Sequence, residues 1–138
     1  MKRHFIIASH SRLASGMADT IRFFAGDVVE LTSLDAYLDN RPIEEQVKRL
    51  VEAVPEDDET LIFTDILSGS VNQKFMPYVA RPHTHLISGM NLPILVALSM
   101  ESQEEYLKEE TIRHLVEESR QQLVYVNGMP ADENDEDE

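Results

Sequence analysis

RHFIIAS, at residues 3–9, sets the fold of this chain, because it is a short apolar run that ends on a polar residue. Runs of this kind are typical of strands that are buried on both faces of a parallel sheet. Apolar side chains then recur at helical spacing over residues 13–24. We therefore predict a strand that leads directly into a helix.

The same alternation continues along the chain and predicts an α/β fold. We expect a doubly wound three-layer sandwich with a mainly parallel sheet, for which 2-1-3-4 is a common strand order. No repeat or linker divides the chain, so we expect one domain over residues 1–128 and an acidic, disordered tail over residues 129–138. The further predicted strands are residues 28–31, 60–65, 84–88 and 123–126, and the further predicted helices are residues 43–54, 71–79, 94–100 and 104–119.

Charge and composition exclude several classes of protein. With 12 basic and 26 acidic residues the net charge is -14, so the chain lacks the positive charge with which nucleic-acid-binding proteins neutralise phosphates. No apolar run approaches the roughly 20 residues that a bilayer span requires. The first residues have no small-residue cleavage site, so we expect no secretory signal, and the sequence contains no cysteine. We expect a cytoplasmic protein with no nucleic-acid partner.

His10 follows the first predicted strand, and ligands of open α/β sheets bind beyond the carboxyl ends of the strands. Imidazole is a nucleophile near neutral pH and can carry a phosphoryl group on nitrogen. We also expect the start of the following helix to offer free backbone N–H groups to an anion. The alternative is a histidine that only caps the end of the strand.

Asp65 stands at the end of the third predicted strand. In the order 2-1-3-4 the first and third strands are neighbours, so Asp65 can accept a hydrogen bond from one ring nitrogen of His10. Such a bond fixes the tautomer, leaves the other nitrogen as the nucleophile and stabilises positive charge on the ring. The alternative role of Asp65 is to cap the following helix.

The remaining histidines and glycines give little support to other chemistry. His83 and His85 form an H-x-H pair, but no third ligand follows at a recognisable spacing, so we expect no metal site. His4 and His114 are interpreted as structural. The glycines form neither a G-x-G-x-x-G nor a P-loop motif, and we expect no cofactor.

Three separated motifs occur in one order: IIASH with LASGM over residues 6–17, TDILSGS over residues 64–70 and ISGMNLPIL over residues 87–95. In order and spacing they resemble the enzyme IIA domain of the mannose-type phosphotransferase system (PTS), over residues 3–126. The resemblance implies a bacterial cytoplasmic carrier that takes a phosphoryl group from the phosphocarrier protein HPr. It passes this group to a IIB domain, which phosphorylates a sugar during uptake.

The resemblance also assigns roles to particular residues. It implies that His10 is phosphorylated on Nε2 while Asp65 holds Nδ1. It further implies a homodimer in which the last, antiparallel strand, here residues 123–126, is exchanged between subunits. Contact with the membrane is then indirect, through the sugar permease.

Three residues depart from the pattern of the family. A glycine usually follows the active-site histidine and a Gly-Gly-Ser-Pro turn follows the aspartate, whereas this chain has Ser11, Ser68 and Val71. The two serines add Cβ atoms where the backbone approaches a phosphate or adopts positive φ, so we expect an altered partner preference or transfer rate. Ser70 keeps the hydroxyl of the turn, and we expect Ser70, Ser11 and Gly69 to bind the phosphoryl group.

Two other functions stay open beside the phosphoryl carrier. The first is a regulatory binding module, in which the phosphorylation state of His10 signals to a partner. The substituted turn slightly favours this function. The second is a phosphate donor for dihydroxyacetone kinase.

Overall fold

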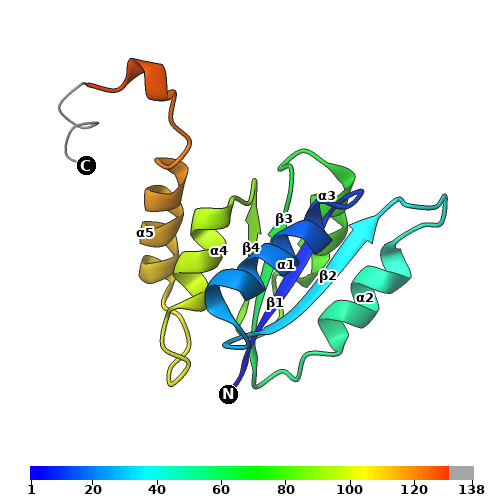
Figure 1. Ribbon diagram of the computed structural model, residues 1–138. Coiled ribbons are helices and arrows are strands. Elements are labelled where there is room, and N and C mark those ends of the chain that lie inside the picture. Colours follow the sequence, from blue (N-terminus) through cyan, green and yellow to red (C-terminus); the bar gives the residue numbers. More distant parts are fainter. Residues whose placement is uncertain (131–138) are drawn as a thin grey trace.

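A four-stranded parallel sheet forms the centre of the molecule, in the order β2-β1-β3-β4. The computed structural model describes residues 1–130, so residues 131–138 of the predicted acidic tail lie outside the described residues. The sheet confirms the predicted α/β fold and its strand order (Figure 1). The strands are β1 (Arg3–His10), β2 (Glu30–Ala36), β3 (Glu59–Thr64) and β4 (Thr84–Ser88).

Helices cover both faces of the sheet and complete three layers. α1, α4 and α5 pack on one face of the sheet, and α2 and α3 pack on the other (Figure 1). A buried cluster of apolar side chains lies between the sheet and the helices on each face. None of the helices in the described part of the chain has the length and apolar character needed to cross a membrane. The helices are α1 (Leu13–Ala25), α2 (Glu44–Glu52), α3 (Ser70–Phe75), η1 (Met76–Tyr78), α4 (Leu92–Ser99), α5 (Glu109–Arg120) and η2 (Val126–Gly128), where η denotes a 3₁₀ helix.

Alternate side chains of β1 supply the two cores. Phe5 and Ile7 belong to the core beneath α1 and α4, whereas Ile6 and Ala8 face α2 and α3. All four side chains are fully buried. Burial of a side chain as large as Ile or Phe contributes roughly 1.5–3 kcal/mol, so β1 ties the layers together through both of its faces.

β1 and β3 lie side by side and end at the same edge of the sheet. Ala8 of β1 pairs with Thr64 of β3, and the chain continues from these residues to His10 and Asp65 respectively. Because all four strands are parallel, their carboxyl ends meet at this edge. The two predicted site residues therefore leave the sheet next to each other.

The last long helix begins at Glu109, later than the predicted residue 104. A buried ion pair accounts for the difference: Arg3 Nε lies 2.5 Å from Glu59 Oε1, and both side chains are fully buried. The other carboxylate oxygen of Glu59 accepts the Leu107 N–H at 2.7 Å, so residues 101–108 are held as a loop. The Arg3 guanidinium also donates to the backbone carbonyls of Glu101, Ser102 and Glu105.

Two other boundaries differ from the predictions for local reasons. β2 runs from Glu30 to Ala36 instead of over residues 28–31, because it pairs with β1 along this length and, as an edge strand, keeps polar residues exposed. The helix predicted over residues 71–79 ends at Phe75 and continues as η1. Pro77 lacks the N–H that a further α-helical turn requires.

The antiparallel strand predicted at residues 123–126 is not confirmed. Residues 123–125 pair with no strand in the described part of the chain, and η2 begins at Val126. The segment extends from the end of α5 away from the sheet (Figure 1). The pairing implied by the resemblance needs the sheet of a second subunit, so a single chain offers these residues no strand partner.

Candidate active site

His10 and Asp65 form a hydrogen-bonded pair at the carboxyl edge of the sheet. Asp65 Oδ2 lies 2.9 Å from His10 Nδ1 and also accepts the backbone N–H of His10 at 2.9 Å. The other oxygen, Oδ1, accepts the Ile66 N–H at 3.0 Å. The Asp65 side chain is 8% exposed and that of His10 is 41% exposed, so the carboxylate is enclosed while the ring faces solvent.

The charge on Asp65 determines the tautomer of His10. Burial raises the pKa of Asp65, but the hydrogen bonds from the backbone and ring of His10 and the adjacent backbone N–H together bring this pKa below its ordinary value. The carboxylate is therefore ionised at neutral pH and can only accept hydrogen bonds. Nδ1 of His10 then carries the proton, and Nε2 presents a free lone pair.

Two hydroxyl groups lie on the Nε2 side of the ring. Ser70 Oγ, at the start of α3, is 3.4 Å from His10 Nε2. Tyr37 Oη lies 2.9 Å from Ser70 Oγ, and the ring centroids of Tyr37 and His10 are 5.5 Å apart. The free nitrogen thus faces an open, polar region instead of the apolar core.

The backbone of Gly69 lies close to the His10 ring. A Cβ atom at residue 69 would lie 3.0 Å from Cε1 of His10 and 3.3 Å from the backbone oxygen of Ile66. The backbone N–H of Gly69 donates to the same Ile66 oxygen at 3.1 Å. The structure therefore brings Gly69 to the site, but its N–H is already used in the hydrogen bond to Ile66 within the turn.

Ser11 occupies the left-handed region, with φ of 55°, as the departure from glycine at this position suggested. The residue is exposed, and its N–H donates to the Ala36 carbonyl at 2.9 Å. Ser11 thus lies directly beside His10 in the chain while its amide is bound to the end of β2.

The start of α1 is not the open anion site that the sequence analysis predicted. Ser9 Oγ accepts the Ala14 N–H at 2.7 Å, and Asp35 accepts the Ser15 N–H at 2.9 Å and the Ser15 hydroxyl at 2.7 Å. A carboxylate from β2 therefore already compensates this positive helix end. The prediction is wrong because Asp35 is brought there by the sheet, not by local sequence.

Buried side chains support the loop that carries Asp65 and Ser70. Asn72 is 3% exposed, and its Oδ1 accepts the Thr64 hydroxyl at 2.7 Å. Its Nδ2 donates to the Leu67 carbonyl at 3.1 Å. These bonds join the end of β3, the following turn and the first turn of α3, so the loop is fixed from its buried side.

Sequence reasoning missed Tyr37. It is the residue after β2, and no motif marks the loop in which it lies. Its backbone φ of 65° places it in the left-handed region, which a residue with a large side chain rarely adopts. Only the three-dimensional placement of β2 beside β1 shows that Tyr37 reaches His10.

The other histidines lie outside this site. His4 Nε2 is 2.9 Å from Asp58 Oδ2, and His83 stacks on Tyr106 with centroids 3.6 Å apart. Burial lowers the pKa of His85, which favours its neutral form. His114 pairs with a glutamate one turn along α5. Within residues 1–130 no group of three or more His, Cys, Asp or Glu side chains is arranged to hold a metal.

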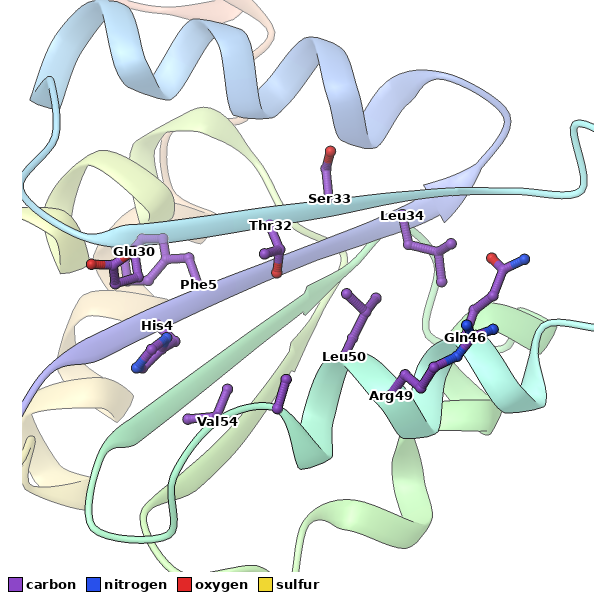
Figure 2. Close-up of a pocket in the computed structure, with 11 residues that line it drawn as sticks. His4, Phe5, Glu30, Thr32, Ser33, Leu34, Gln46, Arg49, Leu50 and Val54 are labelled. Atoms are coloured by element: carbon purple, nitrogen blue, oxygen red, sulfur yellow. The ribbon is translucent and has the colours of Figure 1, made fainter.

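A separate pocket of about 390 Å³ lies between β2 and α2 (Figure 2). Leu34 and Leu50 line it together with Glu30 and Arg49. Figure 2 shows Leu50 rising from α2 toward the sheet. Neither His10 nor Asp65 belongs to this lining, so the pocket is distinct from the histidine site.

Two solved structures similar to this chain are described as parts of the phosphotransferase system. One, from Klebsiella pneumoniae, is assigned as a phosphoenolpyruvate-dependent sugar PTS permease; it is 36% identical, each chain is covered to 93%, and the TM-score is 0.84. A PTS IIA protein associated with the fucose utilization operon of Streptococcus pneumoniae is 26% identical, with 90% of this chain and 98% of that chain covered and a TM-score of 0.72.

A more distant structure shares the fold. The mannose/sorbose-specific IIA subunit from Enterococcus faecalis is 17% identical, with 94% of this chain and 98% of that chain covered and a TM-score of 0.70. Among curated proteins, none matches the sequence significantly. The EIIA-man family model, described as PTS system fructose IIA component, matches residues 4–115. This match takes in most of the described chain, including both members of the His10–Asp65 pair, and the chain therefore belongs to the EIIA-man family of PTS IIA components.

Proposed function

We propose that this chain is a cytoplasmic phosphoryl carrier that accepts phosphate from HPr on His10 and passes it to a IIB domain for sugar uptake. The observation that carries the proposal is the His10–Asp65 pair, in which Asp65 binds Nδ1 at 2.9 Å and Nε2 is left with its lone pair on the side of Ser70. Membership of the PTS IIA family supports the sugar phosphotransferase context. Because the ring is 41% exposed, a partner protein can reach Nε2.

The transfer step uses only side chains already in place. The Nε2 lone pair of His10 attacks the phosphorus of phospho-HPr, an N–P bond forms, and the bond from phosphorus to the HPr nitrogen breaks. The electron pair of that bond leaves with HPr. The Nδ1 proton stays on the ring facing Asp65, whose negative charge stabilises the phosphorylated imidazolium. Transfer to IIB is the same in-line exchange in the opposite sense.

The phosphoryl group on Nε2 is bound chiefly from the side of α3. Ser70 Oγ, 3.4 Å from Nε2, is the nearest hydroxyl donor to the phosphoryl oxygens. Hydrogen bonds of this kind are often long before the reacting group is bound and shorten afterwards. Gly69 allows the close approach, and Ser11, the next residue in the chain after His10, is exposed and is our third candidate for binding the phosphoryl group.

Reconstitution with purified components tests the proposal. The protein is incubated with phosphoenolpyruvate, the general PTS enzyme, HPr and a IIB domain, and acid-labile, base-stable phosphate is measured on each chain. We expect label on His10 that discharges to IIB, and no label on a His10→Ala variant. Label that survives in His10→Ala contradicts the assignment of the nucleophile.

The same assay separates the two other functions. A protein that is charged by HPr but never discharges to IIB behaves as a regulatory module. The substituted turn after Asp65, with Ser68 and Val71, slightly favours this alternative. Discharge to a dihydroxyacetone kinase subunit instead of IIB identifies the third function.

We also propose that the carrier is a homodimer joined through residues 123–126. Leu123 and Tyr125 are 91% and 77% exposed, although both are large and apolar in character. β4 pairs with β3 on one side, and its other edge has no strand partner within residues 1–130. A free edge and an unpaired apolar segment complement each other between two subunits.

A further inference from the structure

Tyr37 reaches the histidine site from the end of β2. Its hydroxyl lies 2.9 Å from Ser70 Oγ, and its ring is tilted by 42° against that of His10 at a centroid separation of 5.5 Å. The side chain therefore contacts both residues on the Nε2 side of the site. Nothing in the transfer step described above accounts for these contacts.

The backbone of Tyr37 is held in an unfavourable conformation. Its φ is 65°, a region that costs free energy for any residue with a Cβ atom. The preceding carbonyl, that of Ala36, accepts the N–H of Ser11, which is itself left-handed with φ of 55°. Strained residues of this kind persist where the surrounding structure fixes them, and they cluster at functional sites. Here the two strained turns are tied together beside His10.

The polar contacts around His10 form a chain with one consistent direction. Ionised Asp65 fixes the proton on Nδ1, so Nε2 is an acceptor and the Ser70 hydroxyl is the donor that faces it. A hydroxyl that donates its proton keeps lone pairs free, so Ser70 Oγ accepts the Tyr37 hydroxyl at 2.9 Å. Tyr37 thereby sets the rotation of the Ser70 hydroxyl.

We propose that Tyr37 is a positioning residue for phosphoryl transfer, which holds the Ser70 hydroxyl toward the group that enters at Nε2 of His10. In the free protein the Ser70 proton points to Nε2, and in the phosphorylated protein it points to a phosphoryl oxygen. In both states the Tyr37 hydroxyl donates to Ser70 Oγ and polarises it. No proton is transferred between these groups. The inference rests on the proposed function and adds to its site Tyr37, the residue that follows β2.

A small phosphoryl donor tests the role without any partner protein. Phosphoramidate donates its phosphoryl group to Nε2: the N–P bond to His10 forms, and the bond to the departing ammonia breaks. The rate of phosphohistidine formation is followed by ³¹P NMR in wild type, Tyr37→Phe, Ser70→Ala and the double variant. We expect Tyr37→Phe to be about tenfold slower, the effect of losing one hydrogen bond that supports a charged transition state.

The double variant shows whether Tyr37 acts through Ser70. If it does, the double variant is no slower than Ser70→Ala, because the Tyr37 hydroxyl has lost the group it orients. Fully multiplicative losses contradict a role through Ser70. Tyr106→Phe is the matched control, because it removes a tyrosine hydroxyl that donates to the Asp57 carbonyl ahead of the amino end of β3. We expect it to react at the wild-type rate.

A second measurement distinguishes positioning from a merely structural role. In wild type the ¹⁵N resonance of His10 Nε2 reports its hydrogen bond, and we expect Tyr37→Phe to shift it while the thermal unfolding midpoint stays unchanged. A Tyr37→Phe protein with wild-type rate and wild-type Nε2 resonance overturns the inference and leaves the proposed function intact. If neither phosphoramidate nor phospho-HPr labels His10 in wild type, the proposed function fails and the role of Tyr37 fails with it.

Discussion

Asp65 faces only hydrogen-bond donors, so the amide of an asparagine cannot replace its carboxylate. One oxygen receives the backbone N–H and the ring N–H of His10, and the other receives the N–H of Ile66. In Asp65→Asn the NH₂ group must therefore face a donor whichever way the amide is turned. We expect phosphoryl transfer to fall by about a hundredfold or more, because the tautomer and the positive ring lose their support.

Rapid-quench measurement of phosphohistidine formation checks this expectation, with the thermal unfolding midpoint as evidence that the variant is folded. The Asp39→Asn variant is a suitable control, because Asp39 pairs with Arg41 at an exposed position. Near-normal transfer in a folded Asp65→Asn protein returns Asp65 to the alternative role of a helix cap.

The lowered pKa of Asp65 also links stability to pH. A carboxyl group whose pKa is lower in the folded than in the unfolded state stabilises the fold above its unfolded pKa of about 3.9, and this contribution disappears as the pH falls through the folded pKa. We expect wild type to exceed Asp65→Asn in unfolding free energy at pH 7, with the difference shrinking below about pH 4. Urea unfolding between pH 7 and 2 measures it. A difference that is constant with pH contradicts the linkage.

Local sequence predicted the hydrogen-bonded pair of His10 and Asp65 but not its surroundings. His10 and Asp65 are found by position alone, because each ends a strand and parallel strands end at one edge. Tyr37 and Asp35 cannot be found in this way. Tyr37 reaches His10, and Asp35 reaches the start of α1, only because β2 lies beside β1. For a loop residue outside any motif, the local sequence does not predict which residues its side chain contacts.

The buried ion pair between Arg3 and Glu59 couples β1 and β3 to the loop before α5. Both side chains are fully buried, so removing one partner leaves the other charge without compensation. We expect Arg3→Met to lower the free energy of unfolding by about 3–5 kcal/mol. The backbone carbonyls of Glu101, Ser102 and Glu105 lose their donor as well, and the loop before α5 loses part of its anchorage.

Urea unfolding and hydrogen exchange test the role of this pair. We expect the amide of Leu107, which donates to Glu59, to exchange faster in Arg3→Met than in wild type. Glu44→Gln is the control, since the Lys74–Glu44 pair is exposed and its loss leaves the unfolding free energy unchanged. Equal stability of Arg3→Met and wild type contradicts the anchoring role.

Most strands and helices were predicted closely, but β2 and the start of α5 were not. β1 and β4 agree with the predicted strands almost to the residue, and β3 is buried along its whole length. The bounds of β2 were predicted incorrectly because this edge strand carries exposed polar residues, which obscure the alternation of apolar and polar residues in its sequence. The start of α5 was misplaced because the contacts that hold the preceding loop come from Arg3, about 100 positions away in the sequence.

The proposed homodimer depends on the segment beyond α5. Residues 123–126 are exposed, and the edge of β4 is free within residues 1–130. Residues 123–126, LVYV, are apolar or aromatic throughout and predict a strand. A strand without a partner in its own chain exists only when a second subunit supplies one, so the sequence of one chain does not determine its conformation.

Two truncations test the proposed exchange of this segment between subunits. Removing residues 122–138 takes away the exchanged strand, so we expect a monomer or an aggregate, because the free edge of β4 is left unpaired. Removing residues 131–138 deletes only acidic and neighbouring residues, and we expect the dimer to remain. Light scattering at micromolar concentration gives the mass of each protein. A mass of one chain for the full-length protein refutes the dimer but leaves phosphoryl transfer untouched, because His10 and Asp65 lie in the same subunit.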